Sequence, residues 1–245
     1  MARILITVPT WNEAGIIAQN LRTLHASCQE RLNEHDWLIE VADNGSQDQT
    51  RQIVETLRHE LDRLTLRAIE TRGKGGAIRN SWLAGEDLFD AFVFLDADLA
   101  ADIRALPALV EPILSGQADL VCGSRFTVGL LIKRSPCRRS LSFAYRMWQK
   151  KVLHLPTEDA QCGFKAVSPR VVHELLPFVQ ERGWLFDTEL LALVAERGLM
   201  TQPLPVDWID QRHANRRSAL SVWRDGWDFI FGVWRIRRRI MKDKM

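Results

Sequence analysis

Two aspartates, Asp96 and Asp98, follow directly on the apolar run 91–95. The run predicts a strand buried on both faces, as in a parallel sheet covered by helices. Open α/β sheets bind ligands at the carboxyl ends of such strands, and residues i and i+2 of an extended chain point to the same side. Two such carboxylates favour a divalent cation, Mg²⁺ or Mn²⁺, which could neutralise a diphosphate. The same tripeptide is also compatible with a strand end that only caps the next helix.

The elements that must position this pair alternate along the chain. Strands are expected at 3–8, 37–42, 64–69 and 92–95, and helices from an Asn12 N-cap to about 29, at 50–61, and from 77 onward. This β-α order predicts a parallel sheet whose carboxyl ends meet at one edge. The first two strands lead into polar loops that contain Thr10 and Asp43, so a nucleoside-diphosphate site at this edge is coherent. No GxGxxG follows the first strand, which disfavours a dinucleotide site.

A lysine among glycines, Gly73-Lys74-Gly75-Gly76, precedes the third predicted helix. Bare backbone N–H groups, a helix N-terminus and a point charge together suit an anion. The spacing is not that of a Walker A loop. The glycines are equally compatible with a loop that simply has to turn.

Composition indicates an ordinary globular chain of 245 residues, with 46% hydrophobic and 26% charged residues and a formal net charge of +2. The four cysteines have no metal-binding spacing, so we expect buried thiols in a reducing compartment: Cys28, Cys122, Cys137 and Cys162. There is no signal-peptide layout after Met1, and no apolar run is long enough to span a membrane. We therefore expect a cytoplasmic protein.

Basic charge is concentrated in the last part of the chain, where residues 211–245 hold ten Lys or Arg and three Asp or Glu. We place a domain boundary here, with domains at 1–210 and 211–245. The second segment is amphipathic, with apolar residues at three- and four-residue spacing: Leu220, Trp223, Trp227, Ile230 and Trp234. Tryptophans beside arginines suit a helix in a membrane interface, and a helix docked on the protein's own core with a solvated basic tail is the alternative.

Seven short motifs, in this order, resemble the family-2 glycosyltransferases of GT-A fold. The motifs are Val8-Pro9-Thr10-Trp11-Asn12-Glu13, residues 42–50, residues 73–77, Asp96-Ala97-Asp98, Gly123-Ser124-Arg125, residues 159–165 and residues 186–190. The closest likeness is to the dolichyl- and polyprenyl-phosphate hexose synthases, more to the glucose than to the mannose type. The resemblance implies an α/β, Rossmann-like fold with a mostly parallel sheet flanked by helices. It also implies inverting transfer of a hexose from UDP-glucose or GDP-mannose to a polyprenyl phosphate.

The resemblance implies roles for individual residues. Donor binding falls to Pro9, Thr10, Glu13, Asp43, Lys74, Asp96, Ala97 and Asp98. Asp98 would be the main ligand of Mg²⁺ or Mn²⁺, with Asp96 as the second acid of the metal pair. The acceptor phosphate would be held by Arg125, Arg138 and Ser142, with Arg139 as the rival of Arg138. Asp98, Arg125 and Arg138 would thus be the catalytic residues.

The chain departs from the family pattern at three positions. Trp11 stands where a tyrosine is usual, Asp43 is the single carboxylate where the family has a pair, and Ala100 replaces a glutamine frequent in mannose-type relatives. Metal coordination is therefore expected to depend more on Asp98 and water. Many relatives carry transmembrane helices, so this chain would need its own amphipathic surface or an integral membrane partner to reach a lipid.

Two other functions stay open. A family-2 transferase acting on a sugar hydroxyl would need a general base, for which Asp159, Asp187 and Glu189 are candidates. The two latter acids are also compatible with a role limited to the helix dipole. A non-enzymatic module would use the basic tail to bind membrane or nucleic acid. We expect no nucleic-acid partner.

Overall fold

The computed structural model describes residues 1–70, 72–125, 136–157, 159–208 and 222–242, and the side chains of all of these except 136–143 and 222–228. In this part of the chain one sheet of seven strands has the order β3-β2-β1-β4-β6-β5-β7. The strands are β1 (Arg3–Thr10), β2 (Asp36–Asn44), β3 (Leu64–Ile69), β4 (Ala91–Leu95), β5 (Leu120–Ser124), β6 (Phe164–Val167) and β7 (Thr201–Pro205). Strand β6 runs antiparallel to β4 and β5, and the other neighbours pair in parallel. The expected mostly parallel sheet is confirmed.

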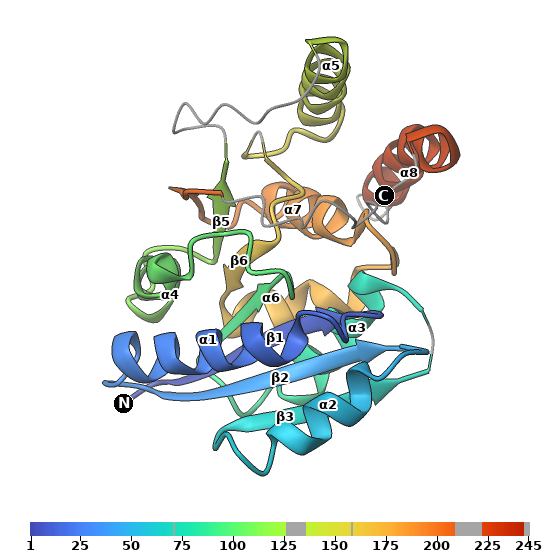
Figure 1. Cartoon of the computed structure of the whole chain (residues 1–245). Coiled ribbons are helices and arrows are strands. Elements are labelled where there is room, and N and C mark those ends of the chain that lie inside the picture. Colours follow the sequence, from blue (N-terminus) through green and yellow to red (C-terminus); the bar gives the residue numbers. More distant parts are fainter. Residues whose placement is uncertain (71, 126–135, 158, 209–221, 243–245) are drawn as a thin grey trace.

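The sheet lies between two layers of helices (Figure 1). Helix α1 contacts α2 and α4, whereas α3 contacts α6 and α7. The helices are α1 (Ile17–Arg31), α2 (Thr50–Leu57), α3 (Lys74–Ala84), α4 (Leu106–Leu114), α5 (Pro136–Leu153), α6 (Pro169–Glu174), α7 (Phe186–Glu196) and α8 (Val222–Lys242), with 3₁₀ turns η1 (Ile103–Ala105) and η2 (Leu176–Phe178). Strand β1 has β2 on one side and β4 on the other, which is the kind of point where such sheets bind ligands.

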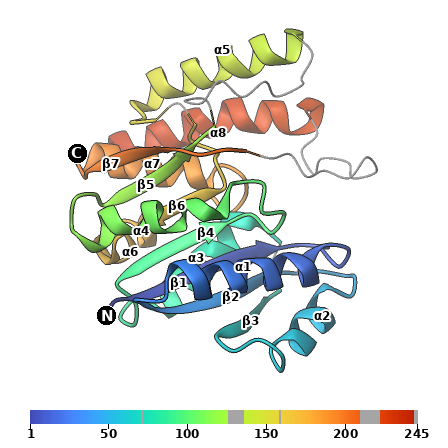
Figure 2. The ribbon, with the colours of Figure 1, turned by 60° about the vertical axis from the view of Figure 1, so that its left-hand side comes forward.

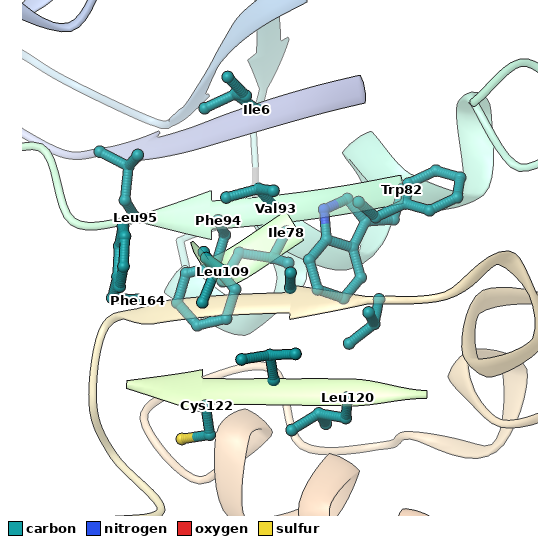
Figure 3. Close-up of a cluster of buried hydrophobic side chains, with 14 of the residues drawn as sticks. Ile6, Ile78, Trp82, Val93, Phe94, Leu95, Leu109, Leu120, Cys122 and Phe164 are labelled. Atoms are coloured by element: carbon teal, nitrogen blue, oxygen red, sulfur yellow. The ribbon is translucent and has the colours of Figure 1, made fainter. Parts of the chain in front are cut away.

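Aromatic side chains fix α3 against the strand that leads into the two aspartates. Trp82 of α3 is fully buried, and its ring centroid lies 6.0 Å from that of Phe94 of β4 (Figure 3). The Phe92 ring of the same strand lies 6.2 Å from Trp82. The ring centroid of Phe186, at the start of α7, lies 6.4 Å from that of Trp82. Burial of each such ring contributes roughly 1.5–3 kcal/mol. These contacts hold the last turn of α3 against β4 and the first turn of α7.

The N-terminal helix begins later than the sequence predicts. Asn12 is not its N-cap, because α1 begins at Ile17. Asn12 has a φ of +55° instead, its side-chain oxygen accepts a bond from the Gln47 N–H (2.8 Å), and its own N–H donates to Ser46 Oγ (2.9 Å). The loop after β1 is therefore attached to the loop after β2. Helix α2 also ends earlier than expected, at Leu57, and α3 begins earlier, at Lys74.

The last helix packs on the rest of the chain between α5 and α7 (Figure 2). Val233 and Ile236 of α8 are fully buried and belong to the main core, and the Phe229 ring lies 5.9 Å from Tyr145 of α5. The opposite face of α8 leaves Trp234 half exposed. Helix α8 therefore docks on the protein's own core, as in the second alternative, and it also has apolar side chains that remain exposed. The expected boundary at 210 falls outside the described residues, as does Leu220.

No described helix combines the length and the low charge needed to cross a membrane. Three of the four cysteines, Cys28, Cys122 and Cys162, are buried free thiols, as expected. Burial raises the pKa of Cys122 to about 11 and that of Cys28 to about 12, so neither is a reactive thiolate at neutral pH.

Candidate active site

Three of the predicted motifs meet at the carboxyl edge of the sheet. Thr10 pairs with Asp43 across β1 and β2. Next to them, the Asn44 side chain donates to the Thr10 carbonyl (3.0 Å) and accepts a bond from the Gly73 N–H (3.1 Å). Asn44 therefore connects the ends of two strands to the glycine-lysine segment. The sequence motif at residues 42–50 includes Asn44 but assigns it no role of its own; its place shortly after a predicted strand is the signal that points to it.

Two buried polar atoms at this edge have no hydrogen-bond partner among the described residues: Asp43 Oδ1 and Thr10 Oγ1. The other carboxylate oxygen of Asp43 accepts bonds from Arg51 and from the Ser46 N–H. A buried polar group without a partner costs roughly 1–3 kcal/mol, so native proteins seldom leave one unless a ligand or water completes it. Both atoms lie where the sequence predicts donor binding. Arg51, which orients Asp43, was not identified from the sequence.

Asp96 is held by a lysine. The Lys74 Nζ lies 2.6 Å from Asp96 Oδ1, and the Lys74 side chain is mostly buried, with 12% of it exposed. Burial alone would lower the pKa of Lys74, but the carboxylates of Asp96 and Asp187 outweigh it and raise this pKa above its usual value. Lys74 is therefore a fixed positive charge. The Asp96 N–H also donates to the Gly163 carbonyl (3.1 Å), which links the pair to residues 159–165.

The two aspartates do not lie on an extended chain, so the expected strand geometry, in which residues i and i+2 point to the same side, does not apply to them. Residues 96–99 form a turn in which the Leu99 N–H donates to the Asp96 carbonyl (3.0 Å), and Leu99 has a φ of +48°. The Asp98 carboxylate accepts a bond from the Ala100 N–H (3.3 Å) and is partly exposed. Among the described residues, no three acidic, histidine or cysteine side chains form a metal cage.

The glycines beside Lys74 have a packing role that neither sequence interpretation included. The Gly76 N–H donates to the carbonyl of Arg182 (2.9 Å), so this group is not available to an anion. A Cβ at Gly75 would collide with the side chain of Phe186. Gly75 therefore allows α3 to approach the chain that leads into α7, whereas a Cβ at Gly76 would meet only ordinary contacts. The expectation of an array of bare N–H groups is thus wrong at Gly76.

Arg125, expected to hold an acceptor phosphate, lies in a bidentate ion pair. Its Nε and Nη2 donate to the Asp159 carboxylate at 2.7 and 2.6 Å, and its guanidinium stacks 4.8 Å from the Trp208 ring. Although burial opposes its charge, Asp159 raises the pKa of Arg125. The other expected acceptor residues, Arg138, Arg139 and Ser142, fall within α5 where side chains lie outside the described part.

The remaining two candidate bases are also paired with cations. Asp187 accepts a bond from Lys165 (2.8 Å), and both side chains are buried, at 3% and 0% exposure. Glu189 pairs through Oε1 with Arg239 of α8 (2.8 Å), while Oε2 accepts bonds from two backbone N–H groups. Burial raises the pKa of Glu189. These acids do more than serve the dipole of α7. Lys165 could have been singled out from the sequence, because a lysine within an apolar strand is rarely buried without a partner.

We predict that Gly163→Ala weakens donor binding, because a Cβ there would collide with the Asp96 carboxylate. The expected loss is about 10-fold or more in nucleotide affinity, the scale of one misplaced charged contact. Calorimetric titration with UDP and GDP measures it. Gly15→Ala is the matched control, because a Cβ at Gly15 meets nothing within 4 Å. Equal affinities for the two variants would show that Asp96 has no part in binding.

Comparison with known proteins identifies the family. The model of glycosyl transferase family 2 matches residues 5–176, which is most of the chain and includes the Asp96–Asp98 turn. The chain belongs to this family. Glycosyltransferase AglD of Haloferax volcanii is 32% identical over 84% of this chain, and dolichyl-phosphate beta-glucosyltransferase of Saccharomyces cerevisiae is 27% identical over 83%. The matched part spans 33% of AglD and 66% of the yeast enzyme.

Solved structures agree on the fold. The family-2 chain superposes on glucosyl-3-phosphoglycerate synthase of Mycobacterium tuberculosis, solved in complex with UDP, with a TM-score of 0.68 and 19% identity. The match covers 96% of this chain and 80% of that one. The GT-A fold expected from the sequence is confirmed for this glycosyl transferase.

Proposed function

We propose that this glycosyl transferase moves a hexose from a nucleotide sugar to a polyprenyl phosphate. The observation that carries the choice of acceptor is the pairing of all three candidate bases with cations, Asp159 with Arg125, Asp187 with Lys165 and Glu189 with Arg239. A sugar hydroxyl needs a base to remove its proton, whereas a phosphate oxygen is already a nucleophile at neutral pH. The name of the yeast relative supports the same acceptor and favours glucose.

The donor would occupy the carboxyl edge of the sheet. Asp43 Oδ1 and Thr10 Oγ1, the two buried atoms without partners, suit the hydrogen-bonding groups of a nucleobase or ribose. Pro9, Glu13 and Ala97 complete the predicted donor set at the same edge. Lys74 and Asp96 form a charged pair beside it, and Lys74 would face the diphosphate as a point charge.

A divalent ion fits this edge if the protein and the nucleotide sugar both supply its ligands. Mg²⁺ usually takes one or two carboxylates, and substrate phosphates and waters supply its other ligands, so a protein cage of three acids is not required. Asp98 would be the main ligand, because Asp96 is engaged by Lys74. Bound there, Mg²⁺ or Mn²⁺ would stabilise the charge of the leaving nucleoside diphosphate.

The chain's own residues would position a single displacement. An acceptor phosphate oxygen attacks the anomeric carbon while the bond from that carbon to the diphosphate breaks, so the configuration inverts. Arg125, held by Asp159, is the described candidate for aligning the acceptor, with Arg138 or Arg139 and Ser142 from α5. Such a reaction depends on positioning and charge stabilisation rather than on proton transfer.

The uncovered face of α8 is the proposed contact with the membrane surface. Four apolar side chains of α8 are 40–61% exposed: Ile230, Phe231, Trp234 and Met241. Two basic residues, Arg238 and Lys242, are also exposed; Arg238 lies four residues after Trp234 and three before Met241. Aromatic and basic residues on one exposed helical face suit an interface with anionic lipid. The protein would then act as a peripheral enzyme at the cytoplasmic face, with or without an integral membrane partner.

This contact predicts that Trp234→Ser weakens binding to phosphatidylglycerol-containing vesicles roughly 10-fold, as expected for removal of a large apolar side chain from an interface. Vesicle co-sedimentation measures the change. Met200→Ser is the control, because Met200 is also exposed (63%) but lies at the turn into β7. Unchanged partitioning of the Trp234 variant would remove α8 as the lipid contact.

Transfer itself is tested with labelled UDP-glucose and GDP-mannose in parallel, with Mg²⁺ or Mn²⁺ and a short polyprenyl phosphate. Label that enters the organic phase with one donor would establish the reaction and identify that donor. Label that stays in the aqueous phase while the nucleotides still bind would favour a soluble hydroxyl acceptor. If neither nucleotide binds, the proposed function is wrong.

A further inference from the structure

The chain between α6 and α7 passes between α3 and α8 (Figure 1). Residues 180–186, which we call the bridging segment, contact both helices. On the α8 side, the Glu181 carboxylate accepts bonds from Arg235 Nε and Nη2 (2.8 and 2.9 Å) and from Arg239. Burial opposes the charge of Glu181, but these two arginines lower its pKa overall. A charged, mostly buried carboxylate thus holds the segment to α8.

Two further contacts fix the same side. Arg239 also reaches Glu189, whose second oxygen accepts the N–H groups of Gln180 (2.8 Å) and Glu181 (2.6 Å). Gly232 of α8 faces Leu185, so closely that a Cβ at this glycine would collide with the leucine side chain. The bridging segment is therefore in direct contact with α8 through charge, backbone hydrogen bonds and packing.

The other side of the bridging segment contacts the start of α3. The Arg182 carbonyl accepts the Gly76 N–H (2.9 Å), and a Cβ at Gly73 or Gly75 would collide with Arg182 or Phe186. Lys74 lies among these glycines. Its ammonium group is 5.8 Å from the centroid of Trp184, which belongs to the bridging segment. The bridging segment thus positions the backbone on both sides of Lys74, whose ammonium group contacts Asp96.

We propose that α8 is a positioning element of the donor site, and that Glu181, Gly232, Arg235 and Arg239 hold Lys74 against Asp96 through the bridging segment. The inference rests on the proposed function and adds to it a role for the C-terminal helix inside the protein. The two faces of α8 then have separate tasks. The inward face positions Lys74 in the donor site, and the outward face, with Phe231 and Trp234, contacts the lipid surface.

The test is Glu181→Gln, which removes the charge that Arg235 and Arg239 contact and keeps the shape of the side chain. We expect the Kd of the nucleoside diphosphate that the wild type binds more tightly, UDP or GDP, to rise about 2- to 30-fold, the range for residues that act through a network. The Kd of the matching monophosphate should change less, because Asp43 and Thr10 are not in the bridging segment. In the transfer assay the KM for the donor should rise more than kcat falls.

Glu174→Gln is the matched control, because it removes an exposed ion pair with Arg170 on α6. Circular dichroism confirms that each variant is folded, and Arg235→Gln is the milder second variant, since it leaves the Arg239 contacts in place. A purely structural role would lower stability but leave the diphosphate affinity of the folded protein unchanged, and that result would overturn the inference. If the wild type binds neither UDP nor GDP, the proposed function fails instead.

Discussion

Asp98→Ala is expected to reduce hexose transfer about 1,000-fold or more, because Asp98 would be the main protein ligand of a divalent ion that supplies several kcal/mol of charge stabilisation. Its carboxylate is partly exposed, so removing it should leave the fold intact. Turnover with saturating nucleotide sugar and Mn²⁺ measures the loss. Nucleotide binding should also lose most of its dependence on added metal.

Asp102→Ala is the matched control for this variant. Asp102 lies four residues further along the same loop, where it caps η1 and pairs with Arg104 at the surface. Its removal should lower stability slightly without a loss of metal-dependent binding. If a folded Asp98→Ala protein turned over at the wild-type rate, the assignment of the metal to Asp98 would be wrong.

Asp187→Asn is expected to lower the free energy of unfolding by about 3–5 kcal/mol, the usual cost of leaving one member of a buried ion pair without its partner. Lys165 would keep its bond to the Cys162 carbonyl but lose its counter-charge. Urea denaturation followed by circular dichroism measures the change. The double variant Lys165→Met/Asp187→Leu should recover much of the loss, because no unpaired charge stays buried.

The same pair makes a prediction about pH. Burial opposes the charge of Lys165, but Asp187 outweighs it and raises the Lys165 pKa. A raised pKa of this sign contributes stability that is fully present below the unfolded value of about 10.4 and is lost as pH rises through the folded value. The wild type should therefore lose stability above about pH 10.4 more steeply than Asp187→Asn. Parallel pH profiles of the two proteins would contradict a charged pair.

Much of the site could be predicted because its motifs are local. Apolar runs ending in polar residues located β1, β2 and β4, and the alternation of strands and helices placed their carboxyl ends at one edge. Asp43, Thr10 and Asp96 therefore lie at the same edge of the sheet, as expected. The order of the motifs also identified the family and its fold.

Other features depend on contacts between distant parts of the chain, which leave no local pattern. The insertion of β6 antiparallel between β4 and β5, the pairing of Lys165 with Asp187, and the packing of Gly75 on Phe186 all belong to this class. A charge pattern shows that α8 is basic but not that Arg235 and Arg239 turn inward to Glu181. The sequence by itself determined the first four strands, the edge at which their polar loops meet and the family, because each follows from residues close together in the chain. Only the tertiary structure decided which charges pair and which glycines are needed, because these depend on side chains that folding brings together.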